Sequence, residues 1–244
     1  MQTLITCIRV NGCNVSIFNT FRSAIALESV DGGTLEDITI ENIKATNTGN
    51  AIFIRLGHRN TGAAIGKVRN IKISNVKVEV PAGKPDKGYE MEGPAVPYPH
   101  NVFPASITGL PGHPVENVTL ENISITYEGG GNKRVAHFSL DSLPKVPEKA
   151  GDYPEFSMFG ELPCWGLYVR HATGIHLKNI KLQYKKEDFR PALIFDDVKQ
   201  LQVQGLQIPT AKSTPVIVLK DVPAPQLNTM KLPFDKSKAV MVWK

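Results

Sequence analysis

The chain has 244 residues, with 28 Lys and Arg against 23 Asp and Glu, which gives a net charge of +5. Its hydrophobic content of 41% and charged content of 21% are typical of a folded protein and exclude a disordered one. No run approaches ~18 uninterrupted apolar residues, so no membrane helix is expected. The three cysteines include no CxxC pair that would indicate zinc, and we expect neither a metal nor a cofactor.

Two strand patterns alternate along the chain. Alternating apolar residues followed by Asn occur at 15–19, 38–43, 71–76, 118–123 and 175–180, with a degenerate copy at 201–206. Short apolar runs occur between them, at 24–27, 51–54, 105–107, 166–169, 192–195 and 216–219. Alternation rich in Ile and Val predicts strands, and the shortest spacings between the Asn positions, 23 and 26 residues, indicate a repeated unit.

Strands that recur at this period predict an all-β parallel β-helix of about six to eight coils with almost no α-helix. Asn tolerates the backbone angles of a tight turn, and stacked amides can hydrogen-bond along a column. We therefore expect Asn42, Asn75, Asn122 and Asn179 to stack at one corner, with Asn122 pointing inward.

Three stretches lengthen the repeat, at 57–67, 81–104 and 128–163. The second and third are rich in Pro and aromatic residues, and each follows an Asn-type strand. Long loops on a compact scaffold are usually functional or disordered, and the aromatic content favours ordered loops that wall a groove. We interpret residues 1–244 as a single β-helix domain that carries these loop insertions.

Five stretches resemble glycoside hydrolase family 28, namely 27–33, 52–59, 108–118, 153–160 and 190–198. The likeness is to bacterial polygalacturonases and rhamnogalacturonan hydrolases and covers about residues 10–205. It implies a right-handed parallel β-helix of the pectin-lyase-like type and inverting hydrolysis of pectic polysaccharide by two carboxylates. It also implies a periplasmic or secreted protein, although no signal peptide is visible at the start of the chain.

The family's catalytic motifs are incomplete in this chain. Asn-Thr-Asp and Gly-His-Gly are absent, and the Asp pair at 196–197 is interpreted as a strand-end turn because the family pair lies early. The Arg-Ile-Lys motif aligns with either 23–28 or 51–55, and we favour 23–28. Both alignments put the acid motifs upstream, so we expect a chain truncated at its N-terminal end. No catalytic residue is assigned in it, and alone it is not expected to hydrolyse polygalacturonate.

Candidate substrate contacts follow two of the short apolar runs. Glu28 and Asp31 flank the end of a strand and could bind sugar hydroxyls, or they could be exposed turn carboxylates. Arg55, His58 and Arg59 form a cationic cluster suited to a uronate carboxylate, or they could form a solvated face.

Three further candidates lie later in the chain. His113 occupies the Pro-Gly-His-Pro turn and could be structural. Arg170 and His171 end a strand, where Arg170 could contact a sugar or form a surface ion pair. The basic balance would attract an acidic plant polysaccharide such as pectin or rhamnogalacturonan. No nucleic-acid motif is present, and we expect a monomer without nucleic-acid or membrane partners.

The main hypothesis is therefore a glycoside hydrolase of polygalacturonase type. The alternative is a catalytically inactive carbohydrate-binding β-helix, and a third possibility is a purely structural solenoid. The irregular, aromatic-rich insertions argue against the third, because structural solenoids tend to have regular turns.

Overall fold

The structure, a computed structural model, describes residues 14–83, 103–131 and 140–243. The chain is mostly β, with 58% strand and 5% helix, so the all-β prediction is confirmed. Predictions that concern Cys7, Cys13 or most of the insertion at 81–104 lie outside the described residues.

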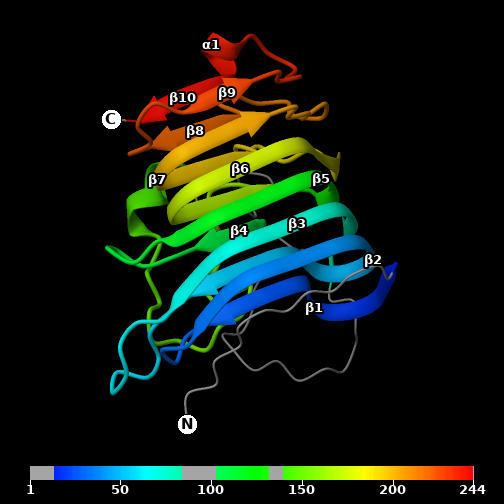
Figure 1. Cartoon of the computed structure of the whole chain (residues 1–244). Coiled ribbons are helices and arrows are strands. Elements are labelled where there is room, and N and C mark those ends of the chain that lie inside the picture. Colours follow the sequence, from blue (N-terminus) through cyan, green and yellow to red (C-terminus); the bar gives the residue numbers. More distant parts are fainter. Residues whose placement is uncertain (1–13, 84–102, 132–139, 244) are drawn as a thin grey trace.

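Long strands form the first part of the described chain and shorter ones the last part (Figure 1). In order they are β1 (Val15–Ser29), β2 (Thr34–Leu56), β3 (Lys67–Val80), β4 (Ala105–Thr108), β5 (Val115–Gly129), β6 (Leu167–Lys186), β7 (Leu193–Gln204), β8 (Ile217–Lys220), β9 (Gln226–Asn228) and β10 (Val240–Trp243). The 3-10 helix η1 (Leu140–Lys145) precedes β6, and the short helix α1 (Lys236–Ala239) precedes β10.

Neighbouring strands pair in parallel in the order β1-β2-β3-β5-β6-β7-β8-β10, and Figure 1 shows them stacked from one end of the molecule to the other. This order follows the predicted strand repeat, because residues at equivalent positions of successive repeats are paired on neighbouring strands. Ile38 pairs with Ile71, Ile71 with Val118, and Val118 with Ile175.

The hydrogen-bonded pairs also close a ring. β2 pairs with β3, β3 with β5, β5 with β6, β6 with β4, and β4 with β2. The main sheet is thus a five-stranded parallel β-barrel, and the prediction of a right-handed parallel β-helix is wrong. The reason is that β2 and β6 are long, and the two parts of each strand pair with different strands. In β2, residues 34–46 pair with β3 and residues 53–55 pair with β4. The four-residue β4 can therefore join them.

Asparagine ladders mark the bends in the long strands. The amide of Asn75 donates to Asn42 over 3.1 Å, Asn122 donates to Asn75 over 3.0 Å, and Asn179 donates to Asn122 over 3.0 Å. All four have positive φ, between 54° and 61°, which Asn adopts more readily than most residues. The predicted stacking is confirmed, but Asn122 is exposed and the expectation that it points inward is wrong. Gly205 follows next to Asn179, also at positive φ.

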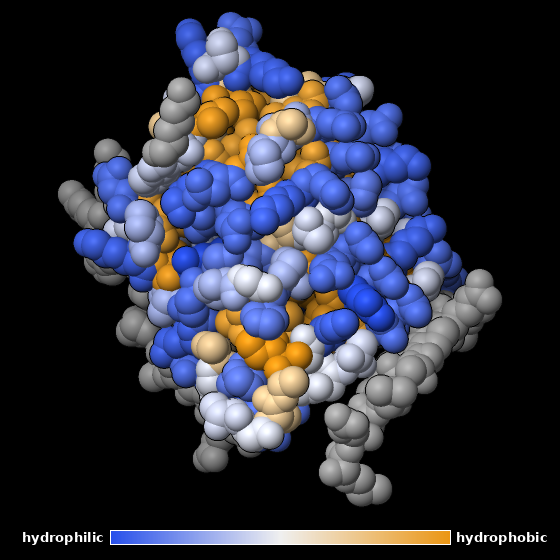
Figure 2. Space-filling view, turned by 60° about the vertical axis from the view of Figure 1, so that its left-hand side comes forward, coloured by the Kyte–Doolittle hydropathy of each residue, from blue (hydrophilic) through white to orange (hydrophobic). Residues whose placement is uncertain are grey.

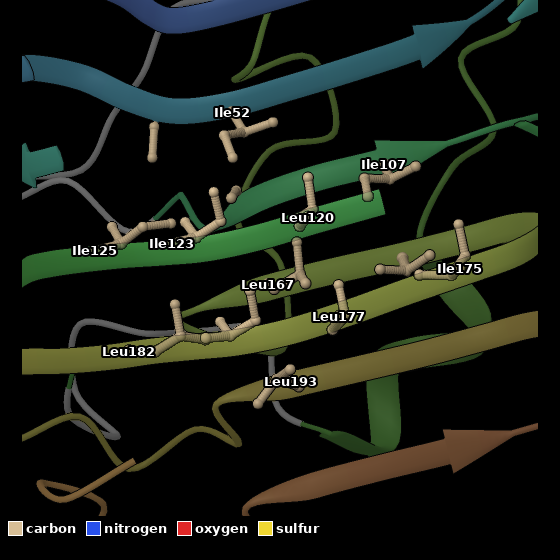
Figure 3. Packing of buried hydrophobic residues seen from close by; sticks show 14 of the residues in the cluster. Ile52, Ile107, Leu120, Ile123, Ile125, Leu167, Ile175, Leu177, Leu182 and Leu193 are labelled. Atoms are coloured by element: carbon tan, nitrogen blue, oxygen red, sulfur yellow. The ribbon is translucent and has the colours of Figure 1, made fainter. Parts of the chain in front are cut away.

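The inward-facing side chains form one large apolar cluster (Figure 3). Ile52, Ile107, Leu120 and Leu193 are at most 2% exposed, and each buried side chain of this size stabilises the fold by about 1.5–3 kcal/mol. The ring of Trp165 packs edge-to-face against those of Tyr127 and Tyr184 at one side of this core.

A second apolar cluster lies on the outer face of the sheet, because alternate residues of a strand point to opposite faces. Its residues on the sheet include Phe53, Tyr168, Ile194 and Val218, which lie in one register across the strands, with Ser106 of β4 between Phe53 and Tyr168. The last part of the insertion at 128–163 covers them with Leu143, Val146, Phe156, Met158, Phe159 and Leu162. This segment, 140–163, is therefore an ordered cover packed on the sheet.

Candidate functional site

A row of polar residues lies two positions beyond the second apolar cluster on the same strands. Positions two apart on a strand share a face, so this row also points outward from the sheet. It consists of Glu28, Arg55, Thr108, Arg170, Asp196 and Lys220, each in register with the next. Neighbours in such a row lie about 4.8 Å apart, close enough for their charges to interact. The structure thus brings three of the predicted site residues, Glu28, Arg55 and Arg170, into one row.

Figure 2 brings forward the side of the molecule on which β8 and β10 end. Hydrophilic residues cover most of this surface, and apolar residues are visible in separate areas. Glu28, at one end of the polar row, is exposed, and Lys220, at the other end, is partly exposed. The middle of the row lies under segment 140–163, which Arg55 and Arg170 contact.

Arg55 is almost fully buried, with 1% of its surface exposed. Its Nη1 donates to the carbonyl of Gly109 over 3.0 Å, and its Nη2 donates to the carbonyls of Glu148 at 2.7 Å and Lys149 at 3.2 Å. The guanidinium also lies 5.3 Å from the ring centre of Phe159. Burial lowers the pKa of Arg55 to about 10, opposed by the charge of Glu148. Arg55 therefore ties segment 140–163 to the sheet.

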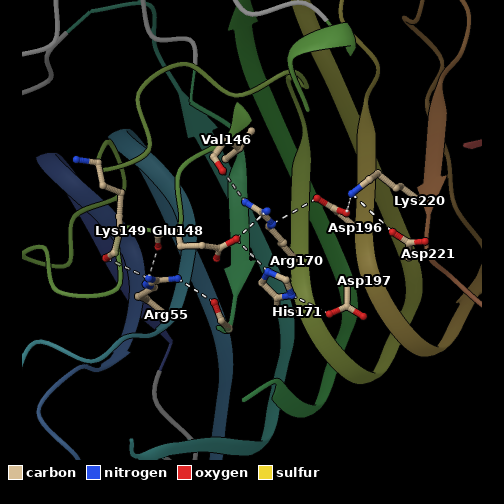
Figure 4. A network of polar contacts seen from close by, with 11 residues as sticks. Arg55, Val146, Glu148, Lys149, Arg170, His171, Asp196, Asp197, Lys220 and Asp221 are labelled. Carbon is tan, nitrogen blue, oxygen red and sulfur yellow. Dashed lines mark hydrogen bonds and ion pairs between the residues drawn. The ribbon is translucent and has the colours of Figure 1, made fainter. Parts of the chain in front are cut away.

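Arg170 holds the same segment from the neighbouring part of the row (Figure 4). Its Nη1 donates to the carbonyl of Val146 over 2.8 Å, and its Nη2 lies 2.7 Å from Oε1 of Glu148. On its other side, Nε lies 3.3 Å from Oδ2 of Asp196. Asp196 is 2% exposed and accepts a hydrogen bond of 2.7 Å from Lys220, so positive and negative charges alternate toward β8.

His171 sits between two carboxylates at the end of the first part of β6. Its Nδ1 lies 2.7 Å from Asp197 and its Nε2 lies 3.2 Å from Glu148. Burial alone would lower the pKa of His171, but the hydrogen bonds to Glu148 and Asp197 raise it above 6.5. Burial alone would likewise raise the pKa of Glu148, but His171 and Arg170 lower it below 4.5. The pair is thus held as imidazolium and carboxylate in mildly acidic solution.

The remaining cationic candidates lie apart from this network. Arg59 forms a two-point ion pair with Asp31, at 3.0 Å and 2.5 Å, and both side chains are exposed. The hydrogen bond from Arg59 lowers the pKa of Asp31. The ring of His58 contacts the carbonyl of Ala63 at 3.0 Å, within the insertion at 57–67.

His113 is also separate from the charged row. Its backbone exchanges two hydrogen bonds of 2.9 Å with Leu110, which closes the predicted turn. The predicted sugar-binding residues therefore divide into the charged row with His171, the exposed pair of Asp31 and Arg59 with nearby His58, and the isolated turn at His113.

Glu28 lies at the open end of the row, beside a hollow of about 320 Å³. The hollow is lined by Arg22, Ser23, Ala26, Glu28, Tyr153, Pro154 and Glu155. Glu28 is an exposed residue at its rim, and protein atoms partly surround its carboxyl group. This partial burial raises the pKa of Glu28 to about 7 against the opposing charge of Arg22. Arg22 also forms an ion pair with the buried Glu155.

Sequence reasoning missed Glu148, Lys220, Arg22 and Glu155 and interpreted the Asp pair at 196–197 as a turn. For Lys220 and Asp196 a signal existed, because each ends an apolar run as Arg55 and Arg170 do. Glu148 and Glu155 lie in a Pro-rich insertion with no periodic pattern, so nothing in their local sequence indicates their partners.

No protein-family model matches the chain, and no curated protein or solved structure matches it either. Among the described residues, no group of three or more His, Cys, Asp or Glu is placed to hold a metal ion. None of the helices in the described ranges is long and apolar enough to cross a membrane. The chemistry of the site therefore has to be inferred from its own residues.

Proposed function

We propose that the protein is a glycoside hydrolase that acts on acidic plant polysaccharide, and that the hollow at Glu28 forms part of its substrate site. The observation that carries this proposal is the geometry of the hollow, whose lining holds the carboxyls of Glu28 and Glu155 together with Arg22. The pKa of Glu28, which partial burial raises to about 7, supports it. A carboxylic acid kept protonated by its surroundings is the group that glycosidases use as a general acid.

The other residues of the hollow suit a sugar acid. Arg22 is a cation that can approach a uronate carboxylate, and Ser23 offers a hydroxyl for hydrogen bonds. The ring of Tyr153 is partly exposed and presents an apolar face against which a sugar ring can pack. Glu155 is a second carboxyl group in the lining, and it forms an ion pair with Arg22. One protonated and one ionised carboxyl are the pair that glycoside hydrolysis requires.

In this proposal Glu28 donates its proton to the leaving glycosidic oxygen as the bond from that oxygen to the sugar carbon breaks. Water adds to this carbon and gives up a proton to the solvent, and Glu28 takes up a proton from the solvent, so the net change is the cleavage of one glycosidic bond by one water molecule. The resemblance of the chain to family 28 supports the same reaction class, although the residues at the hollow do not match the family's acid motifs.

The test is the release of reducing ends from polygalacturonate and from rhamnogalacturonan by the purified protein. We expect activity to fall as the pH rises through about 7, because only the protonated form of Glu28 donates. Glu28→Gln should reduce the rate roughly 10²–10⁴-fold. Glu28→Asp should retain part of the activity, and Glu187→Gln, on an exposed loop after β6, should change nothing. Activity that survives Glu28→Gln would overturn the role of Glu28.

A second candidate is a carbohydrate-binding protein without catalysis. The carboxyls of Glu148, Asp196 and Asp197 each form an ion pair with a basic side chain. Among these described carboxyls and that of Glu28, only Glu28 has a raised pKa, and this observation favours the second candidate. A single acid contributes only about 10²–10⁴-fold, whereas enzymes supply about 10⁶-fold or more. Binding of polygalacturonate with no release of reducing ends, the outcome expected from the sequence for this chain alone, would favour this candidate.

A further inference from the structure

We propose that a lysine track on the outer face of β2, β3, β5 and β6 binds a linear anionic polysaccharide, a polyuronate, at a site separate from the hollow at Glu28. The track consists of Lys44, Lys77 and Lys181 and ends at Lys231. This proposal does not rest on hydrolysis and holds for a binding protein as well as for an enzyme.

The register of the sheet aligns the track. Lys44 pairs with Lys77, Lys77 with Ser124, and Ser124 with Lys181. Single bridges continue the row from Lys181 to Gln207 and from Gln207 to Lys231. With adjacent strands about 4.8 Å apart, the cations extend over roughly 24 Å in one line. Such a line suits an extended polymer better than a small ligand.

The side chains of the track point away from the core. Lys44 precedes Ala45 and Lys77 precedes Val78, and both of these apolar residues are 1% exposed and belong to the main core. Because neighbours on a strand alternate between faces, Lys44, Lys77 and Lys181 are exposed. They line a trough of about 450 Å³ together with a second row that runs beside them.

The charges of the track are not neutralised by the protein. Among the described residues, Lys44, Lys77 and Lys181 form no ion pair, whereas most other charged side chains near the sheet do. The one acidic residue that lines the trough, Glu79, is paired with Lys185. Unpaired cations in a line raise the local positive potential and attract a polymer of opposite charge.

The second row decides which polyanion the trough suits. It contains Thr46, Thr126 and Gln183, and Ser124 lies within the lysine row itself. Hydroxyl and amide groups between cations match a polymer that carries both hydroxyls and carboxylates on each unit. Single-stranded nucleic acid is bound chiefly on rows of aromatic side chains, and the residues that line this trough include none. A polyuronate is therefore the better match.

One aromatic residue lies at the end of the second row. Phe18 is in register with Thr46 and is 63% exposed, the second most exposed large apolar side chain in the described ranges. A ring in this position can pack against the apolar face of a terminal sugar unit. It gives the track a defined end on β1.

Binding of polygalacturonate to the full chain is measured by affinity electrophoresis and calorimetry at low and high salt. The triple variant Lys44→Gln/Lys77→Gln/Lys181→Gln should weaken binding roughly tenfold or more, because three exposed charge contacts are lost. The matched control is Lys67→Gln/Lys199→Gln/Lys238→Gln, which removes the same charge from exposed lysines outside the trough and should change affinity less than about twofold. High salt should abolish the difference.

Three results would overturn the proposal: no binding by the wild-type chain, equal losses in the two triple variants, or tighter binding of single-stranded nucleic acid than of polygalacturonate under the same conditions. All six lysines are exposed, so neither triple variant removes a buried contact, and circular dichroism checks that both are folded. The release of reducing ends by Glu28→Gln reports on the hollow, whereas the difference in affinity between the two triple variants reports on the track. Failure of the proposed function and failure of the track are therefore distinguishable.

Discussion

The asparagine ladders and the Arg55–Arg170 network are built on the same strands in two different ways. In the ladders, one residue type repeats at equivalent positions, and each amide bonds to its copy on the next strand. In the network, residues in register on neighbouring strands differ in type or charge, and Arg55 and Arg170 reach the insertion at 128–163. The ladders stabilise bends of the strands, whereas the network attaches a cover to the sheet.

The difference lies in how far each contact reaches along the chain and how deeply it is buried. The ladder amides are exposed at the surface, and water can replace each bond when it breaks. Arg55 is buried and donates hydrogen bonds to three carbonyls, two of which belong to residues more than 90 positions away along the chain. The loss of a buried charged donor leaves its acceptors without partners, so the network should be far more sensitive to substitution.

The largest effect is expected for Arg55→Met, which keeps the length of the side chain but removes its donors. We expect the free energy of unfolding to fall by about 3 kcal/mol, because the carbonyls of Gly109, Glu148 and Lys149 lose a buried donor. Urea denaturation measures the change. Hydrogen exchange should show segment 140–163 opening while the β2–β3 pair stays protected.

The control for this prediction is Arg59→Met, which removes an exposed guanidinium that forms an ion pair with exposed Asp31 and lies 5.9 Å from the ring centre of Tyr153. Its urea midpoint should barely change, because exposed ion pairs contribute little. Similar midpoints for the two variants would mean that Arg55 does not hold the cover.

A smaller effect is expected in the middle of the ladder. Asn122→Ala should cost about 2 kcal/mol, since it removes two exposed amide bonds and places a side chain without amide at a φ of 56°. Asn122→Gly should cost about half as much, because glycine accepts positive φ, as Gly205 does at the end of the same ladder. Equal losses in the two variants, measured by thermal or urea unfolding, would show that the backbone angle is not what selects Asn there.

The smallest effect concerns the pH dependence of the network. The hydrogen bonds that His171 donates to Glu148 and Asp197 raise its pKa above 6.5, so its contribution to stability is complete below 6.5 and is lost as the pH rises through the folded pKa. The free energy of unfolding of the wild type should therefore fall as the pH rises above 6.5 and passes through the folded pKa of His171. The comparison is His171→Asn, which tolerates the φ of 49° but does not titrate.

This pH window leaves Glu148 ionised, because its pKa lies below 4.5 and its contribution is lost only as the pH falls further. The wild-type and His171→Asn curves should converge toward the alkaline end. Parallel curves across the window would mean that the carboxylates around His171 do not stabilise its charged form.

Much of the strand pattern could be predicted from the sequence. The Asn positions and the alternating Ile and Val residues identify the strands and the residues that point into the core, because both depend on local backbone geometry with a period of two. The polar residue that follows each apolar run, charged in all but Thr108, was a usable signal for the polar row. The hollow at Glu28 was not predictable, because Glu155 and Tyr153 come from an insertion of irregular sequence.

The sequence by itself determined a chain of parallel, repeated strands with stacked Asn residues, because a ladder needs only the same residue at equivalent positions of successive repeats. Only the tertiary structure decided that β4 joins β2 to β6 and closes the barrel, and that Glu148 meets Arg55, Arg170 and His171. Arg55 and Glu148 are 93 residues apart, and contacts of that range depend on how all the intervening strands pack. No local pattern of residues encodes that packing, so the ring closure and the charged network become visible only in the folded chain.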